Sequence, residues 1–157
     1  MSEVFVVGCA ASCRSIRGLL LAAALFIPLI GAAAAPPAQC PQPRFTGKAP
    51  PEYYDRRSPL AADADTRGAE RAFRGDGRNA SCATCHGEKG DGRGPMSDMF
   101  EPPPRNFRCK ETINGIPDGQ IFWIIRFGSP GTSMPPNTRF SDAEVWEFVA
   151  YLRKLAR

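Results

Sequence analysis

Three segments after residue 62 carry apolar residues at the spacing of an α-helix. The clearest begins at Ser141, where Ser141 and Glu144 form a capping-box pattern that satisfies the free amides of a helix start. From there, apolar side chains recur every three or four residues along one face: Val145, Phe148, Val149, Leu152 and Leu155. The pattern predicts a helix from Ser141 to about Leu155 that buries this face.

The first of the other two helices is predicted from near Asp65 to Phe73 or Arg74. Either Asp65 or Thr66 can cap its start, and a glycine follows its end. Gly68 leaves a flat spot at which another backbone can approach closely.

The remaining helix is predicted from about Asp118 to Phe127, after Pro117. It is apolar around most of its circumference, which implies burial. No alternating strand pattern of useful length is present, so we predict an all-α fold with long loops.

Residues 1–34 have the pattern of an export signal. Arg14 and Arg17 precede an apolar run that ends in four alanines, and cleavage after Ala34 leaves small residues where the peptidase recognises them. The apolar run of about 18 residues is near the lower limit for a membrane span, so a retained anchor is the alternative. We favour cleavage. Residues 35–62 are rich in proline and are predicted to form an extended arm or linker, and residues 63–157 one domain.

Such an all-α domain has a small core. Three short helices joined by a loop of about 30 residues bury little apolar surface, and loops of that length inside a compact domain usually carry function. A large planar apolar cofactor at the centre would supply the missing core, with the loops wrapped around it.

Residues 82–86 have the sequence Cys-Ala-Thr-Cys-His, the attachment signature of a c-type haem. On a short helical turn, the thiols of Cys82 and Cys85 point to the same side, where each can add to one vinyl group. His86 then turns its imidazole onto the iron. The motif predicts one covalently bound haem c.

Two other uses of a Cys-x-x-Cys pair are the alternatives. A structural zinc site needs four ligands, so Cys40 and Cys109 would have to be recruited from distant positions. A thioredoxin-like redox pair needs a βαβ unit, which the pattern lacks. We favour haem over both. In an exported protein, Cys40 and Cys109 can form a disulfide or remain two free thiols, and the sequence leaves this open.

Ligation by two histidines within one chain is impossible, because His86 is the only histidine in the chain. A methionine, a lysine or an open position remains. Met134 lies far beyond His86 in the sequence, in a loop that flanking prolines would stiffen. Met96 and Met99 follow His86 too closely to pass around a porphyrin, and we expect them to pack beneath it. We predict His86 and Met134 as the metal ligands.

The charge excludes one class of partner. The formal net charge is +4, of which the segment 1–34 contributes +1. Two haem propionates would reduce the remainder to about +1, so no strongly basic surface is indicated. Binding of nucleic acid therefore has no support.

Over residues 63–157 the sequence resembles the class I c-type cytochromes, in particular monohaem bacterial members. The shared features are the attachment signature, Gly94-Pro95, Met134-Pro135 and a final helix that ends near Lys154. The resemblance implies a cytochrome c-like fold, with three core helices and long loops around one covalent haem.

The resemblance also implies particular contacts. The first and last helices would cross at four residues: Gly68, Phe73, Phe148 and Tyr151. The carbonyl of Pro95 would accept a hydrogen bond from the outer nitrogen of His86, although an ordinary turn residue is the alternative. A proline-rich stretch looks like the strap beneath the haem propionates, where Arg105, Asn106 or Trp123 could bond a propionate. We favour a solvated arginine and a packed tryptophan.

Together these features predict a periplasmic carrier of single electrons between a donor and an acceptor redox protein, and not an enzyme. A second hypothesis, motivated by the arm, is a haem subunit docked in a larger respiratory or dehydrogenase complex, including a membrane-bound one. A third is a haem enzyme or sensor with an open sixth position on the iron.

Overall fold

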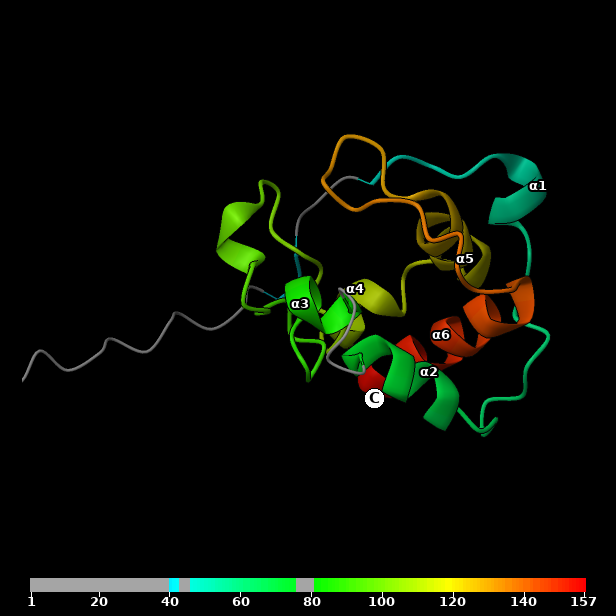
Figure 1. Cartoon of the computed structure of the whole chain (residues 1–157). Coiled ribbons are helices and arrows are strands. Elements are labelled where there is room, and N and C mark those ends of the chain that lie inside the picture. The colour runs from blue at the N-terminus through cyan, green and yellow to red at the C-terminus, as the bar shows by residue number, and fades with distance from the viewer. Residues whose placement is uncertain (1–39, 43–45, 76–80) are drawn as a thin grey trace, which may run out of the picture. The chain divides into compact units, whose positions relative to one another are not determined.

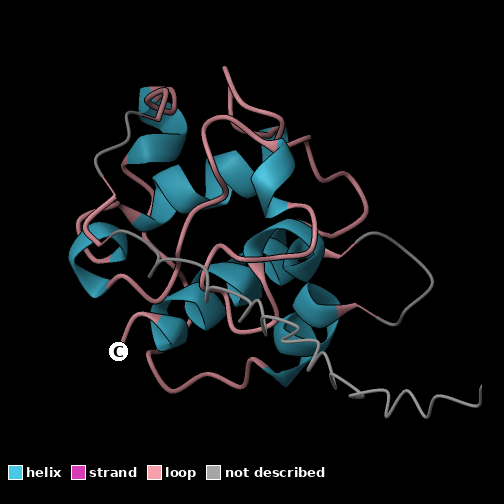
Figure 2. Ribbon diagram, turned by 90° about the vertical axis from the view of Figure 1, so that its left-hand side faces the viewer, coloured by secondary structure: helices cyan, strands magenta, loops and turns pink. Residues whose placement is uncertain are grey.

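The structure, a computed structural model, describes residues 40–42, 46–75 and 81–157. Within these ranges the chain forms helices and loops and contains no strand, which confirms the predicted all-α fold (Figure 2). The predicted export signal over residues 1–34 lies outside the described residues. In the part of the chain that is described, no helix combines the length and apolar character needed to cross a membrane.

The helices are short and are joined by long loops (Figure 1). In chain order, the described elements are α1 (Pro51–Tyr54), α2 (Arg67–Arg74), α3 (Cys82–His86), the 3₁₀ turn η1 (Ser97–Met99), α4 (Lys110–Ile113), α5 (Asp118–Phe127) and α6 (Asp142–Leu155).

The three helices predicted from the sequence are confirmed as α2, α5 and α6. α5 has the predicted bounds, and α6 follows Ser141, whose Oγ accepts a hydrogen bond from Glu144 N at 3.3 Å. α2 starts at Arg67, later than expected. Asp65 Oδ1 accepts a hydrogen bond from Arg67 N at 3.0 Å, and this side-chain bond holds Asp65 in a turn before the helix.

α2 and α6 cross as the resemblance implied (Figure 1). The rings of Phe73 and Tyr151 meet edge to face with centroids 5.5 Å apart. At Gly68, however, the neighbour is a side chain and not a backbone, because a Cβ there would lie 3.1 Å from Glu147 Oε2.

α5 packs on α6 through aromatic and charged contacts. Phe122 is buried against Trp146, with ring centroids 4.5 Å apart. Arg153 of α6 donates to Asp118 Oδ1 at the start of α5, at 3.0 and 2.7 Å, and to the carbonyls of Ile113 and Ile116. The connection from α4 to α5 is therefore fixed to the last helix.

The sequence predicted an extended arm or linker over residues 35–62, and the described part of this segment packs on α5. We call residues 46–62 the arm. Gln120 of α5 accepts a hydrogen bond from Ala49 N (2.7 Å) and donates one to Gly47 O (2.8 Å). These bonds fix the arm to α5 although its prolines prevent a long helix.

A close backbone contact completes the docking of the arm. A Cβ at Gly119 would lie 1.8 Å from the carbonyl oxygen of Tyr53, so only glycine allows α1 to approach α5 so closely. The ring of Tyr53 meets that of Phe127 edge to face, with centroids 5.1 Å apart. A backbone contact at a glycine leaves no mark in the hydrophobic periodicity, so the sequence pattern could not predict it.

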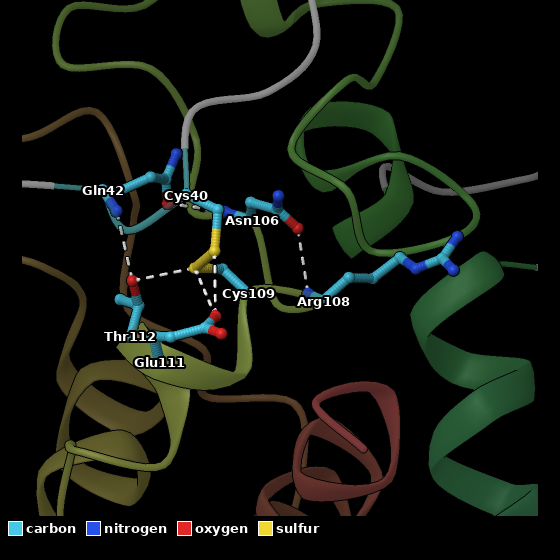
Figure 3. Close-up of a disulfide and its surroundings, with 7 residues drawn as sticks. All are labelled: Cys40, Gln42, Asn106, Arg108, Cys109, Glu111 and Thr112. Atoms are coloured by element: carbon cyan, nitrogen blue, oxygen red, sulfur yellow. Dashed lines mark hydrogen bonds between the residues drawn. A yellow bond between two sulfur atoms is a disulfide. The ribbon is translucent and has the colours of Figure 1, made fainter.

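A disulfide joins Cys40 to Cys109, with 5.6 Å between their Cα atoms, and settles the question that the sequence left open (Figure 3). The Thr112 hydroxyl accepts a hydrogen bond from Gln42 N at 3.2 Å. Gln42 Oε1 in turn accepts one from Asn106 N at 2.8 Å. The chain that precedes the arm is thus tied to α4 and to the segment before it.

Candidate functional site

The cysteine pair and the histidine lie together on α3. This short helix follows Ser81, whose backbone N–H donates to Thr84 Oγ1 at 3.2 Å. It ends at Gly87, where φ is +77°, a conformation that suits glycine. α3 thus presents both thiols and the imidazole on one short helix.

The loop after α3 folds back along the helix. Gly92 N donates to His86 O at 2.8 Å, and Gly94 N donates to Cys85 O at 3.0 Å. A Cβ at Gly94 would lie 2.3 Å from Thr84 O, so the loop requires glycine here. These contacts stabilise a helix too short to be stable alone.

The two motif thiols are half-buried, and neither forms a disulfide. Burial raises the pKa of Cys82 and of Cys85, so both are protonated thiols at neutral pH. Both cysteines are also reduced and lie on one short helix, as attachment to two vinyl groups requires.

The imidazole of His86 is oriented by a main-chain oxygen, but this is not the predicted one. Nδ1 lies 3.0 Å from the carbonyl oxygen of Arg105, in place of Pro95. Pro95 is exposed, because its loop folds along the backbone of α3, where Met96 N donates to Thr84 O at 3.1 Å. The segment that contains Arg105 passes the ring instead.

Contacts around Phe107 hold that segment in place. The Phe107 ring stacks on the imidazole of His86, with centroids 4.4 Å apart, and Phe107 N donates to Gly90 O at 2.7 Å. Arg105 is only 8% exposed, which corrects the expectation of a solvated arginine, and its guanidinium donates to Thr46 Oγ1 at 2.9 Å. Trp123 packs against Phe127, as expected.

A cavity of about 480 Å³ is lined by both predicted metal ligands, His86 and Met134. Cys82, Cys85 and Pro95 are not among its lining residues. Most of the wall is apolar and comes from α4, α5, α6 and the segments between them: Phe107, Ile113, Ile116, Pro117, Ile121, Ile124, Ile125 and Leu152. An apolar wall with a few polar groups suits a large planar organic ligand.

Met134 reaches the cavity on a loop that is closed by its own backbone. Ser129 N donates to Met134 O at 3.1 Å, and Met134 N donates to Thr132 Oγ1 at 3.2 Å. Met96 and Met99 are 37% and 73% exposed and do not line the cavity. Among the methionines of the described ranges, Met134 is therefore the one that shares a cavity with His86.

One buried polar atom supports the fit of a ligand. Among the described residues, Ser129 Oγ is the buried side-chain oxygen that has no hydrogen-bond partner, and Ser129 lines the cavity. An unsatisfied buried hydroxyl costs about 1–3 kcal/mol, which a polar group of a bound ligand would relieve. The imidazole, the thioether and the apolar wall of the cavity fit a haem, and the two thiols that could bind it covalently lie on the same short helix as His86.

The sequence did not identify the arm as part of this site. Three arm residues, Thr46, Lys48 and Tyr54, line the cavity, and so does Gln42, which precedes the arm. Their segment has no helical period, and its prolines indicate an extended chain. The two adjacent tyrosines at 53 and 54 were the signal that this segment packs, since large aromatic side chains favour burial.

The family comparison agrees with this geometry. The sequence model of a family described as "Cytochrome c" matches residues 77–156, just over half of the chain. Among solved structures, a chain of the reducing HAO-like protein complex of Kuenenia stuttgartiensis is similar, with 30% identity and a TM-score of 0.40. That match covers 47% of this chain and only 37% of the other. No curated protein matches the sequence.

Proposed function

Because the chain belongs to the cytochrome c family, we propose that it is a periplasmic carrier of single electrons whose one haem is ligated by His86 and Met134. Membership in the family implies a covalently bound haem c and a role in electron transfer. The observation that carries the finer proposal is the cavity, because two side chains from distant parts of the sequence line it together.

The residues of the site have separate roles in this proposal. When bound, the haem supplies an iron that takes up and releases one electron. Cys82 and Cys85 would hold it to α3 by thioether bonds. The carbonyl of Arg105 can only accept a hydrogen bond, so it fixes the proton of the neutral His86 ring on Nδ1 and leaves the lone pair of Nε2 for the metal.

Met134 and the apolar wall determine the electron affinity of the site. A thioether ligand and a water-poor surrounding both favour the reduced, less charged iron, which raises the reduction potential. If His86 and Met134 both bound the iron, they would leave no position on the metal for a substrate. The site therefore suits a carrier that exchanges electrons with redox proteins, and not an enzyme.

Two observations support export to an oxidising compartment. Residues 1–34 have the pattern of an export signal, and Cys40 and Cys109 form a disulfide. The hypothesis of a permanently docked subunit relied on a free arm. Because the described part of the arm packs on α5 and lines the cavity, it serves this chain's own site.

Absorption spectroscopy of protein from a host that exports and matures c-type cytochromes tests the proposal. We expect pigment that acid-acetone does not extract, a weak red band of a methionine–iron bond in the oxidised state, and slow binding of carbon monoxide to the reduced state. Colourless protein would refute the haem, and rapid binding of carbon monoxide would refute Met134 as a ligand and the carrier role.

A further inference from the structure

The described residues that line the cavity include positively charged side chains and no negatively charged ones. Among the described lining residues, Lys48 and Arg105 are cationic, and no aspartate or glutamate is present. A cavity with this wall attracts an anionic ligand, or the anionic part of a larger one. A haem carries two such groups, its propionate carboxylates.

The cations and the unpaired hydroxyl lie on segments that meet. Arg105 donates to Thr46 Oγ1 of the arm at 2.9 Å. A Cβ at Gly47 would lie 3.9 Å from Pro130, so the arm also touches the loop that carries Met134. Figure 1 shows the cyan arm running beside this orange loop. Lys48 and Ser129, each next in sequence to one of these contact residues, therefore lie on adjoining parts of the wall.

Two features suit this part of the wall to carboxylates. Ser129 is 4% exposed, and its Oγ lacks a partner, so it has a proton to donate to a ligand. Lys48 Nζ lies 4.3 Å from the centroid of the Tyr54 ring, a cation–π contact that keeps the ammonium group at the cavity.

We propose that the arm forms part of a haem propionate site, in which Lys48 and Ser129 bind the carboxylates. The inference depends on the proposed function, since it requires a bound haem. It adds a segment that lies outside the family match at residues 77–156. The arm thereby closes the haem cavity with residues from outside the family match and sets part of the reduction potential.

The test compares the variants Lys48→Met and Lys110→Met as holoproteins. Lys110 is an exposed lysine on α4 that does not line the cavity, which makes it a matched control for loss of one charge. A cation beside a propionate favours the reduced haem, so Lys48→Met lowers the reduction potential. It also raises the propionate pKa, which moves the pH inflection of the potential upward by about one unit.

Further measurements separate the propionate site from a general charge effect. The potential difference between Lys48→Met and Lys110→Met shrinks at high salt, because Lys48 is exposed. Ser129→Ala shifts the propionate bending modes in the resonance Raman spectrum, and Lys110→Met leaves them unchanged. Equal potentials and equal pH profiles in the two lysine variants would overturn the inference while leaving the proposed function intact. Loss of covalent haem from the wild type would overturn both.

Discussion

The thioether of Met134 reaches the cavity because its loop doubles back on itself. Gly128 has φ of +82°, and a Cβ there would lie 2.8 Å from Met134 O. The amide of Ser129 donates to the same oxygen at 3.1 Å. The position of the sulfur therefore depends on backbone contacts of small residues and not only on the flanking prolines.

Replacing this methionine tests its role directly. Met134→Leu keeps an apolar side chain of similar size, so we expect a folded holoprotein that lacks the methionine–iron band and binds carbon monoxide rapidly when reduced. Met99→Leu is the control, because Met99 is 73% exposed and does not line the cavity. An unchanged spectrum in Met134→Leu would assign the sixth position to another group.

The sequence supplies proposals for the side chains of the site, but it carries little information about backbone groups. Cys82, Cys85 and His86 are proposed from their spacing. Met134 is proposed because it lies far beyond His86, in a loop that flanking prolines would stiffen. The predicted hydrogen-bond partner of His86 Nδ1, the carbonyl of Pro95, was wrong. Every residue carries a carbonyl, and no sequence pattern marks the one that faces a ring. Arg105 supplies it because the Phe107 segment folds against Gly90, a tertiary contact that no local pattern encodes.

At the scale of helices, periodicity located the three long helices and missed the short ones. α6 buries an apolar stripe, and α5 is apolar around most of its circumference. Each arrangement leaves a clear pattern in the sequence. α1 and α4 have four residues each, so they cannot show a repeat. Their places depend on contacts with other elements, such as the approach of Tyr53 to Gly119.

The capping box of α6 gives stability that depends on pH. Hydrogen bonds from Ser141 N and Oγ to the Glu144 carboxylate lower the pKa of Glu144 below its usual 4.5. A lowered pKa means that this stabilisation is complete above pH 4.5 and is lost as the pH falls through the folded value.

We therefore expect wild type to exceed Glu144→Gln in unfolding free energy at neutral pH, with the difference shrinking in more acidic solution. Urea denaturation of both proteins over a pH series measures this difference. If the difference in unfolding free energy between the two proteins grew below pH 4.5, the Glu144 carboxylate would not stabilise the helix start as proposed.

The contact of the arm with α5 predicts an unusual effect of alanine in a helix. Alanine normally stabilises a helix interior over glycine by about 0.5–1 kcal/mol. Gly119→Ala instead places a Cβ on the carbonyl of Tyr53, and we expect a loss of about 1–3 kcal/mol in unfolding free energy. Gly115→Ala is the control, since its nearest atoms lie at an ordinary 3.6 Å. If Gly119→Ala were as stable as Gly115→Ala, the arm would not rest on α5.

Across the whole molecule, the cofactor cavity is closed by chain from both ends of the described sequence. The arm provides polar lining, and α6 provides Leu152 and the core that supports α5. The sequence predicted that a cofactor would complete a small core. It did not predict that the proline-rich segment would contribute, because composition describes the local stiffness of a chain and not its tertiary contacts.

The disulfide between Cys40 and Cys109 contributes to the stability of the folded chain. Cys40 and Cys109 are 69 residues apart, and closing a loop of that length in the unfolded chain corresponds to about 4 kcal/mol by chain entropy. We expect Cys40→Ser/Cys109→Ser holoprotein to lose stability of this order in denaturant titrations. Because Cys109 is buried, wild type under thiol reductant is the second measurement, in which no serine is introduced.

Loss of the disulfide also tests whether the arm is held at the cavity. The thioether bonds to haem resist thiol reductants, so the reduced protein keeps its pigment while the start of the arm is released. We then expect faster proteolysis within residues 46–62 and a reduction potential that moves toward that of Lys48→Met, since a detached arm carries Lys48 away. Wild-type resistance to proteolysis after complete reduction would show that Gln120 and Gly119 hold the arm without the disulfide.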